Sequence, residues 1–282
     1  MHEHHSRLSL SEQVAHAIRV HSAKGAAVAL AAAAARQIVP VWWNQKAPWY
    51  AGRVAERFRS PARLDGSRFN VPDGPTATSF KGLLWVERYE TLERHAIAKW
   101  LSKTLPLVEL GASIGVVSCL ANRRLLDSTR HVAVEANPAI IPVLRSNRDQ
   151  NRCRFQIVHA ALAYGAESVD FGISDNVVAN SVASAHSSAH VRVPTVSLGS
   201  LTANAGFDAC SLVCDIEGAE RDLMAHEADV LRRVVESVIM EVHPGILGED
   251  GVADLYDRFR GLGFSPVWQR GSIWVLSKTK PH

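Results

Sequence analysis

The chain has 282 residues, of which 47% are hydrophobic and 21% charged, and its formal net charge at pH 7 is +3. This length can bury a substantial core, either as one large domain or as a domain with an extension, and the composition excludes global disorder. The small net charge argues against an obligate nucleic-acid partner, because a binder driven by charge would show a clustered basic face.

The cysteines and the apolar segments bear on the cellular compartment. Four cysteines at positions 119, 153, 210 and 214 lack the C-x-x-C spacing of metal and redox sites, so we interpret them as reduced core thiols of a cytoplasmic protein. The longest uncharged apolar segment, residues 25–35, is too short to cross a bilayer, so no membrane span is predicted. No apolar run follows the polar amino terminus, which predicts no signal peptide.

Residues 1–60 are predicted to form a helical N-terminal extension. Apolar residues recur at helical spacing over residues 10–20, and the alanine-rich run after them has high helix propensity until Pro40 ends it. An aromatic cluster follows, which either grips a substrate or anchors the extension to its domain: Trp42, Trp43, Trp49 and Tyr50.

The main domain is predicted to comprise residues 85–282. Residues 61–84 precede it and contain many turn-forming residues, which indicates an irregular linker. An amphipathic helix is expected over residues 89–101, and it leads directly into a short apolar strand that ends near Leu110.

The stretch after this strand, Gly111-Ala112-Ser113-Ile114-Gly115, can turn tightly into a helix over residues 116–126. Glycines permit backbone dihedrals and close approaches that a side chain would block, and the first N–H groups of a helix attract negative charge. A strand, a glycine turn and a helix N-terminus together predict a cradle for an anionic or polar ligand.

Three ligand chemistries compete for this cradle. A dinucleotide requires G-x-G-x-x-G with a middle glycine, but Ser113 occupies that place. Glu109, two residues before the first glycine, would oppose a pyrophosphate but could pair with an ammonium group. A zwitterionic ligand is therefore favoured over a dinucleotide.

The glycine loop also matches the G-x-S-x-G nucleophile elbow of α/β-hydrolases, with Ser113 as nucleophile. Asp215 and His243 follow in the chain order of such a triad. However, a hydrolase sheet places several strands before the elbow, whereas the chain before residue 100 is predicted to be mostly helix and loop. A hydrolase of this type therefore remains the weaker alternative.

A second apolar strand, residues 131–135, ends in Glu135, 24 residues after Gly111. A carboxylate at this place can accept hydrogen bonds from both hydroxyls of a ribose. Together with an ammonium partner at the first strand, it favours S-adenosylmethionine, the third candidate ligand.

The remaining strands are predicted at residues 155–158, 211–215 and 238–244, followed by an antiparallel hairpin of residues 264–268 and 273–276. His159 and Ala160 follow the third of the parallel strands, where small residues suit an adenine. A polar loop over residues 176–190 lies between two short strand-like pieces, and its low hydrophobicity fits a mobile lid and an ordinary flexible loop equally well.

At this point the chain resembles the FkbM-type S-adenosylmethionine-dependent methyltransferases over roughly residues 85–277. The resemblance rests on three motifs: Glu109-Leu-Gly111-Ala-Ser-Ile-Gly115, Val134-Glu135-Ala-Asn137-Pro138 and Asp215-Ile-Glu217-Gly218-Ala-Glu220. It implies an α/β fold with a Rossmann-like class I methyltransferase sheet of seven strands, the last antiparallel. Val213 and Gly199 stand where the family usually has lysine and aspartate, which bears on the substrate class more than on the cofactor.

The predicted cofactor site for S-adenosylmethionine comprises Glu109, Gly111, Ala112, Ser113, Gly115, Glu135, Ala136, Asn137, His159, Ala160 and Asp215. The predicted catalytic residues are His243, Asp215 and Glu217, at strand ends that face the sulfonium. His243 is the first choice as general base, since histidine titrates near neutral pH, but it could instead only cap its strand.

The resemblance implies a small-molecule or glycan acceptor, methylated on a hydroxyl of a sugar or secondary metabolite. Asp215 could help to bind a divalent cation, but spacing alone supplies no convincing second and third ligand, so no metal site is predicted. A methyltransferase-like scaffold without catalysis is a further alternative. The sequence indicates no oligomeric state.

Overall fold

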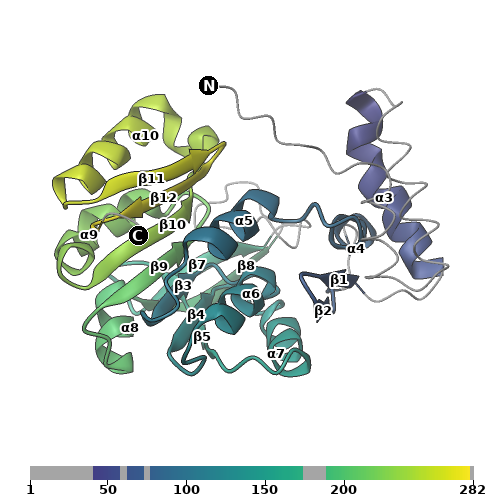
Figure 1. Cartoon of the computed structure of the whole chain (residues 1–282), viewed down its shortest axis with the longest axis horizontal. Helices are drawn as coiled ribbons and strands as arrows, with labels where there is room; N and C mark the ends of the chain where they lie inside the picture. Colours follow the sequence, from purple (N-terminus) through teal and green to yellow (C-terminus); the bar gives the residue numbers. More distant parts are fainter. Residues whose placement is uncertain (1–40, 58–61, 73–76, 174–188, 280–282) are drawn as a thin grey trace. The chain divides into compact units, whose positions relative to one another are not determined.

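The computed structural model describes residues 41–57, 62–72, 77–173 and 189–279 (Figure 1). The helix predicted over residues 10–20, the alanine-rich run and most of the loop over residues 176–190 lie outside the described residues. The chain divides into two compact units, Met1–Val71 with Thr76–Tyr89, and Pro72–Pro75 with Glu90–His282. The boundaries predicted near residues 60 and 84 stay a prediction; in this division the segment up to Tyr89 belongs to the first unit.

The first unit contains two helices and a small hairpin, namely α3 (Val41–Arg57), β1 (Ala62–Leu64), β2 (Ser67–Phe69) and α4 (Ala77–Trp85). The two helices approach closely at glycines, because a Cβ on Gly52 would lie 1.7 Å from the carbonyl oxygen of Thr78. Glu56 of α3 accepts a hydrogen bond from the Thr78 hydroxyl at 3.0 Å. Trp49 and Tyr50 are each 45% exposed, so they do not serve as buried anchors within this unit.

The second unit is built on a sheet of seven strands in the order β11-β12-β10-β9-β3-β4-β5. Its strands are β3 (Leu107–Leu110), β4 (His131–Glu135), β5 (Gln156–His159), β9 (Cys210–Cys214), β10 (Val235–Glu241), β11 (Ser265–Arg270) and β12 (Ile273–Ser277). The neighbouring strands β10, β9, β3, β4 and β5 pair in parallel, whereas β12 is antiparallel to both of its neighbours, β10 and β11. This order confirms the predicted Rossmann-like sheet with an antiparallel last strand.

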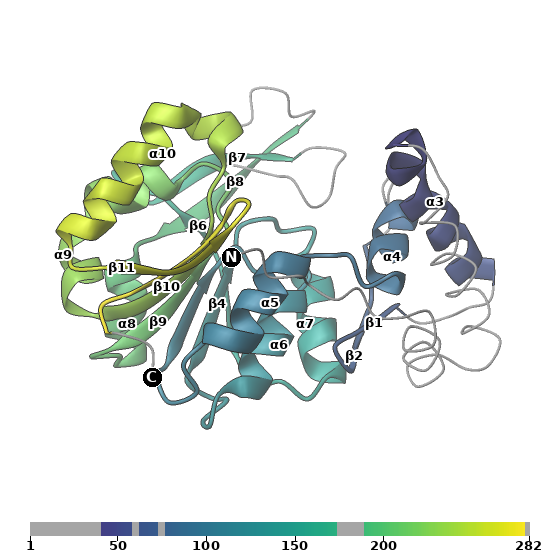
Figure 2. The same cartoon turned by 45° about the horizontal axis from the view of Figure 1, so that its top comes forward.

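Helices cover both faces of the sheet (Figures 1 and 2). The helices are α5 (Thr91–Trp100), α6 (Val116–Arg124), α7 (Ile141–Gln150), α8 (Leu198–Ala205), α9 (Glu220–Arg233) and α10 (Pro244–Gly261). Val108 and Leu110 of β3 pack into the core beneath α8, α9 and α10. Leu107 faces the other side, in a core with residues of α5 and α6. Both faces are apolar, as expected for strands of a parallel sheet.

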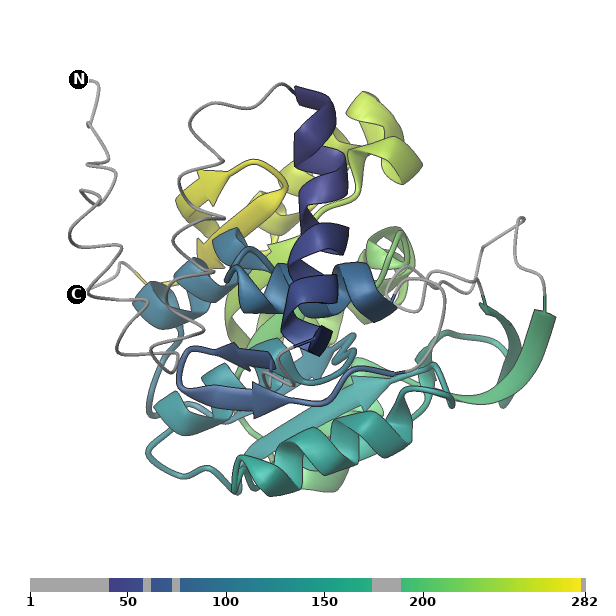
Figure 3. The same cartoon turned by 90° about the vertical axis from the view of Figure 1, so that its right-hand side faces the viewer.

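A second sheet of three strands, in the order β6-β8-β7, follows β5 along the chain. It consists of β6 (Ala161–Leu162), β7 (Ser168–Ile173) and β8 (Ala189–Val196). The ribbon of β7 and β8 extends away from the body of the second unit (Figure 3). Its base carries Phe171 and Val193, which are buried against Ala161, so this small sheet adds apolar residues beyond the end of β5.

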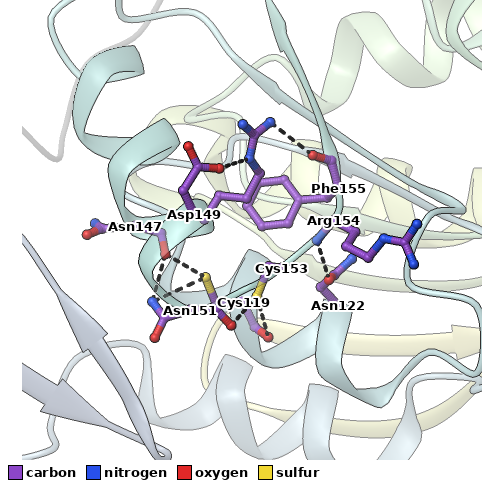
Figure 4. A network of polar contacts seen from close by, with 9 residues as sticks. Cys119, Asn122, Asn147, Asp149, Asn151, Cys153, Arg154 and Phe155 are labelled. Carbon is purple, nitrogen blue, oxygen red and sulfur yellow. Dashed lines mark hydrogen bonds and ion pairs between the residues drawn. The ribbon is translucent and has the colours of Figure 1, made fainter.

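The helix α7 supports the glycine loop from behind. The Asn147 side chain is fully buried, and its amide donates to the carbonyl of Ile114 at 2.8 Å. The Asn147 backbone carbonyl accepts from Asn151 at 2.7 Å and from the Cys119 thiol at 3.8 Å, within the polar network of Figure 4. Cys119 and Cys153 lie in this network as free thiols. A polar network with its members paired gives a rigid backing to the loop.

None of the helices within the described residues has the length and apolar character needed to cross a lipid bilayer.

Asn147→Ala is expected to lower the free energy of unfolding by about 1–3 kcal/mol, because the buried carbonyl of Ile114 loses its donor. Urea denaturation followed by tryptophan fluorescence measures the change. Arg145→Ala, on the exposed face of the same helix, is the control and should shift stability by less than about 0.5 kcal/mol. Equal stability of Asn147→Ala and the wild type would contradict this support role.

Candidate functional site

A pocket lies at the carboxyl ends of β3, β4 and β9. In chain order the strands are added from β3 toward β5 on one side of β3, and then from β9 toward β10 on its other side, so the pocket lies where the strand order reverses. Open α/β sheets bind their ligands at such a position. Eight of the predicted site residues line this pocket: Gly111, Ser113, Glu135, Ala136, Asn137, Ala160, Asp215 and Glu217. Five others do not line it: Glu109, Ala112, Gly115, His159 and His243.

The glycine loop closes over the end of β4. The backbone N–H groups of Gly111 and Ala112 donate to the carbonyl of Val134 at 3.0 and 2.9 Å. Gly111 has a φ of 88°, and a Cβ there would lie 1.7 Å from the carbonyl oxygen of Asp215. Only glycine fits this place, because both the dihedral and the contact exclude a side chain. The loop therefore brings the ends of β3, β4 and β9 together.

Glu135, at the carboxyl end of β4, is held by two backbone donors. One carboxylate oxygen accepts from the N–H of Ser113 at 2.7 Å, and the other accepts from the N–H of Asn137 at 2.7 Å. Burial raises the pKa of Glu135, and the hydrogen bonds from Asn137 and Ser113 oppose this rise. Each oxygen keeps a second lone pair for a ligand donor. The carboxylate can thus accept from two neighbouring hydroxyls in the pocket.

Glu109 is placed differently from the predicted ammonium partner. Its side chain is 1% exposed. It accepts from the Ser118 hydroxyl at 2.9 Å, and its other oxygen lies 2.9 Å from Nε2 of the buried His131. In the strand register it shares a face with Leu107, the face that α5 and α6 cover. The carboxylate is therefore a buried structural group beneath the loop, and we correct its predicted contact with the ligand on this ground.

The wall beside β6 and β7 is apolar. It is formed by Ile140, Ala160, Ala161, Leu162 and Phe171. Such a surface suits a flat ring such as adenine. The His159 ring lies outside the pocket lining, with Nε2 3.2 Å from the carbonyl oxygen of Ala136, so this contact holds the backbone after β4 and does not point to a bond with a base.

On the opposite side of the pocket, Asp215 and Glu217 form an acidic wall next to His243. Nε2 of His243 lies 3.4 Å from Oδ1 of Asp215 and 3.6 Å from Oε2 of Glu217. Nδ1 of His243 lies 2.7 Å from Oε1 of Glu220, whose side chain is 0% exposed. The structure thus brings together all three predicted catalytic residues, although only Asp215 and Glu217 reach the pocket.

The charges around His243 decide its protonation. Burial alone lowers the pKa of His243, but the hydrogen bond to Glu220 and the charges of Glu220, Asp215 and Glu217 raise it to about 9. Burial, followed by repulsion from Glu90 and Glu241, raises the pKa of Asp215. In this state the imidazole carries a proton at neutral pH. A protonated ring cannot accept another proton, which weighs against His243 as the general base.

Sequence reasoning missed two members of this cluster. The sequence placed Glu220 only in a motif, but it is buried and its carboxylate lies 2.7 Å from Nδ1 of His243. Glu241 ends β10, and one of its oxygens accepts from the Ser272 hydroxyl at 2.8 Å. The signal for both was present, since an acid at the first residue of a helix and an acid at a strand end can face the same histidine.

Ser113 does not form a hydrolase triad with Asp215 and His243. Its hydroxyl oxygen is buried and makes no hydrogen bond with any residue in the described part of the chain. His243 is held instead by Glu220, and its other nitrogen faces Asp215 and Glu217. A nucleophile needs a base within hydrogen-bond reach, and the described residues supply none to Ser113.

Gly111→Ala is expected to lower the free energy of unfolding by roughly 2–4 kcal/mol, because the methyl group must displace the backbone of Asp215 and the φ is unfavourable. Chemical denaturation measures the loss. Gly261→Ala is the matched control: nothing lies within 4 Å of a Cβ there, and alanine favours the helix. A Gly111→Ala protein as stable as wild type would show that the loop does not have this geometry.

Comparisons with solved structures give distant likenesses. A methyltransferase from Pyrococcus furiosus is 13% identical with a TM-score of 0.43, and the match covers 83% of this chain and 98% of that one. A protein of the NADB-Rossmann superfamily from Streptococcus agalactiae is 10% identical with a TM-score of 0.42, covering 67% of this chain and 69% of that one. Aeropyrum pernix fibrillarin, solved with bound S-adenosyl-L-methionine, is 9% identical with a TM-score of 0.39, covering 62% and 67%.

No curated protein matches the chain significantly. The model of the methyltransferase FkbM domain matches residues 109–266, which is more than half of the chain. The match includes the glycine loop, Glu135 and the segment from Asp215 to His243. The chain therefore belongs to the FkbM methyltransferase domain family.

Proposed function

We propose that this protein transfers the methyl group of S-adenosylmethionine to a hydroxyl of a small-molecule or glycan acceptor. The observation that carries the proposal is the carboxylate of Glu135, which lines the pocket and is held by the N–H groups of Ser113 and Asn137. Membership of a methyltransferase family supports methyl transfer itself. The hydroxyl acceptor follows from the resemblance and stays a proposal.

The pocket residues fit the three parts of the cofactor. Glu135 would accept from the ribose hydroxyls, and the apolar wall that includes Leu162 and Phe171 would cover the adenine. Since Glu109 is buried beneath the loop, the ammonium group needs another partner. Asp215 and Glu217 are the carboxylates on the pocket wall that can serve.

The bound cofactor supplies an activated methyl group, so the protein mainly has to align the acceptor and take its proton. Asp215 is the group best placed for the proton, because it lines the pocket, whereas His243 does not. His243 acts on Asp215 from behind, through Nε2 at 3.4 Å. We therefore assign Asp215 as the proton acceptor and His243 as a positioning residue, in place of His243 as base.

Two other predictions carry over unchanged. A cytoplasmic location and the lack of a nucleic-acid partner stay predictions. A non-catalytic scaffold would have no need of two carboxylates on the pocket wall opposite a ribose site, and this arrangement favours an enzyme.

Isothermal titration calorimetry with S-adenosylhomocysteine tests the cofactor site. The wild-type chain should bind one equivalent, and Glu135→Gln should weaken the affinity about 10- to 100-fold, or about 1.4–2.8 kcal/mol, because the amide loses the charge and one acceptor. Glu236→Gln, at the far end of β10, is the control and should bind as wild type. Absence of binding by the wild type would contradict the proposed function; unchanged binding by Glu135→Gln would remove Glu135 from the site.

A fluorophosphonate probe separates the two enzyme classes. We expect no covalent labelling of the wild-type chain, because the Ser113 hydroxyl is buried without a base. Mass spectrometry of the treated protein measures the label, and Ser113→Ala serves as the control. Labelling that disappears in Ser113→Ala would favour the hydrolase.

A further inference from the structure

We propose that Asp215, Glu241 and His243 bind one divalent metal cation at the edge of the cofactor pocket. One ligand atom of each, a carboxylate oxygen or an imidazole nitrogen, lies within 4.8 Å of the other two. Asp215 directly follows β9, Glu241 ends β10, and His243 lies between β10 and α10. β9 and β10 are paired and parallel (Figure 1), so their carboxyl ends bring these three residues to the same end of the sheet.

The imidazole of His243 is oriented as a metal ligand would be. Its Nδ1 lies 2.7 Å from Oε1 of Glu220, a fully buried carboxylate, so the ring is fixed and Nε2 is directed at Asp215. Metal-ligating histidines commonly donate their second nitrogen to a carboxylate in this way, which sets both the ring orientation and the tautomer. Nε2 faces two carboxylates at 3.4 and 3.6 Å, beyond the usual length of a direct hydrogen bond. A cation bound at Nε2 would displace the proton that this nitrogen carries in its absence.

The carboxylate oxygens of Asp215 and Glu241 also favour a cation at this place. Oδ1 of Asp215 is buried and makes no hydrogen bond with any of the residues that the structure describes. Oε1 of Glu241 is steadied by the Ser272 hydroxyl at 2.8 Å. Among the described residues, the positive group nearest to Oδ1 of Asp215 is the imidazole of His243, with Nε2 3.4 Å away. A buried carboxylate oxygen without a hydrogen bond is costly. Since Glu217 also lies within 3.6 Å of the same imidazole nitrogen, the negative groups at this point outnumber the single histidine.

The spacing of the ligand atoms suits a metal ion. A metal about 2.1 Å from each ligand atom holds neighbouring ligands roughly 3.0–3.4 Å apart and opposite ones roughly 4.2 Å apart. The Asp215–His243 separation of 3.4 Å falls at this value. One imidazole with two carboxylates is a donor set for a first-row divalent ion such as Mn²⁺, because it joins nitrogen to hard oxygen ligands.

The position gives such an ion a role that rests on the proposed function. Asp215 belongs both to this cluster and to the pocket wall. An ion held by Asp215 therefore borders the space into which an acceptor must come. A divalent ion binds hydroxyl oxygens and makes their protons easier to remove, which would select acceptors that present an oxygen to the ion.

Binding of Mn²⁺ to the full chain tests the site. Metal is first removed with a chelator, and the chelator is then removed before the titration. Electron paramagnetic resonance of free Mn²⁺ and calorimetry should both give one bound ion per chain. Glu241→Gln and His243→Ala should each weaken binding at least 10-fold. Glu236→Gln is the matched control: Glu236 lies at the amino-terminal end of the strand that Glu241 ends, and this variant should bind Mn²⁺ as wild type does.

The same samples are titrated with S-adenosylhomocysteine in the presence of chelator, which reports folding and the cofactor site separately. Both ligand variants should still bind it. No saturable Mn²⁺ binding by the wild type, or wild-type affinity in both variants, would overturn the metal site while leaving the cofactor site intact. Mn²⁺ binding that depends on Glu241 and His243 in a chain that fails to bind S-adenosylhomocysteine would support the metal site and contradict the proposed function.

Discussion

The site depends on the way that the chain turns over the end of β4. The N–H groups of Gly111 and Ala112 bind the carbonyl of Val134, and the next N–H in the loop, that of Ser113, binds the carboxylate of Glu135. These contacts tie the loop after β3 to the end of its neighbour in the sheet. They also immobilise Glu135 with both oxygens already oriented, so that a ligand does not have to order this side chain on binding.

The acidic wall is a second constraint, and it is electrostatic. Asp215, Glu217 and Glu241 are gathered around one imidazole, and burial together with mutual repulsion raises the pKa of Asp215 and Glu217. Glu93 of α5, buried next to Glu90, has its pKa raised in the same way. Carboxylates arranged like this favour a positive charge nearby. A sulfonium, an ammonium group and a metal cation all satisfy that preference, and Asp215 belongs both to the pocket wall and to the cluster with Glu241 and His243.

Much of this architecture could be predicted from the sequence because it follows local patterns. The apolar runs identified the parallel strands, and the hairpin of β11 and β12 was expected from its turn residues. The α10 helix is an exception: it begins at Pro244, directly after the strand, with a break at Gly248 where φ is 72°. Glycines at this spacing resemble a loop in sequence, and only packing against the sheet reveals that helical turns lie on either side.

The incorrect prediction for Glu109 concerns the face of the sheet toward which its side chain points. Glu109 was expected in the pocket because it precedes the glycine loop by two residues. Alternation along β3 sends it to the same side as Leu107, where Ser118 and His131 bind it. Both faces of this strand are covered, so hydrophobicity does not tell which side leads to the pocket. That choice depends on tertiary packing.

The pocket walls differ in polarity, and this difference constrains where the reaction can occur. Ala160, Leu162 and Phe171 line one part of the pocket, and Asp215 and Glu217 line another, with Gly111 among the residues that line it as well. A ligand with an apolar ring and a charged end has one favourable orientation in such a space, because reversing it would bury its charge against Phe171. The charged end then lies next to Asp215. In the proposed function, a group carried at that end would be transferred on the acidic side, where His243 lies 3.4 Å from Asp215 and 2.7 Å from Glu220.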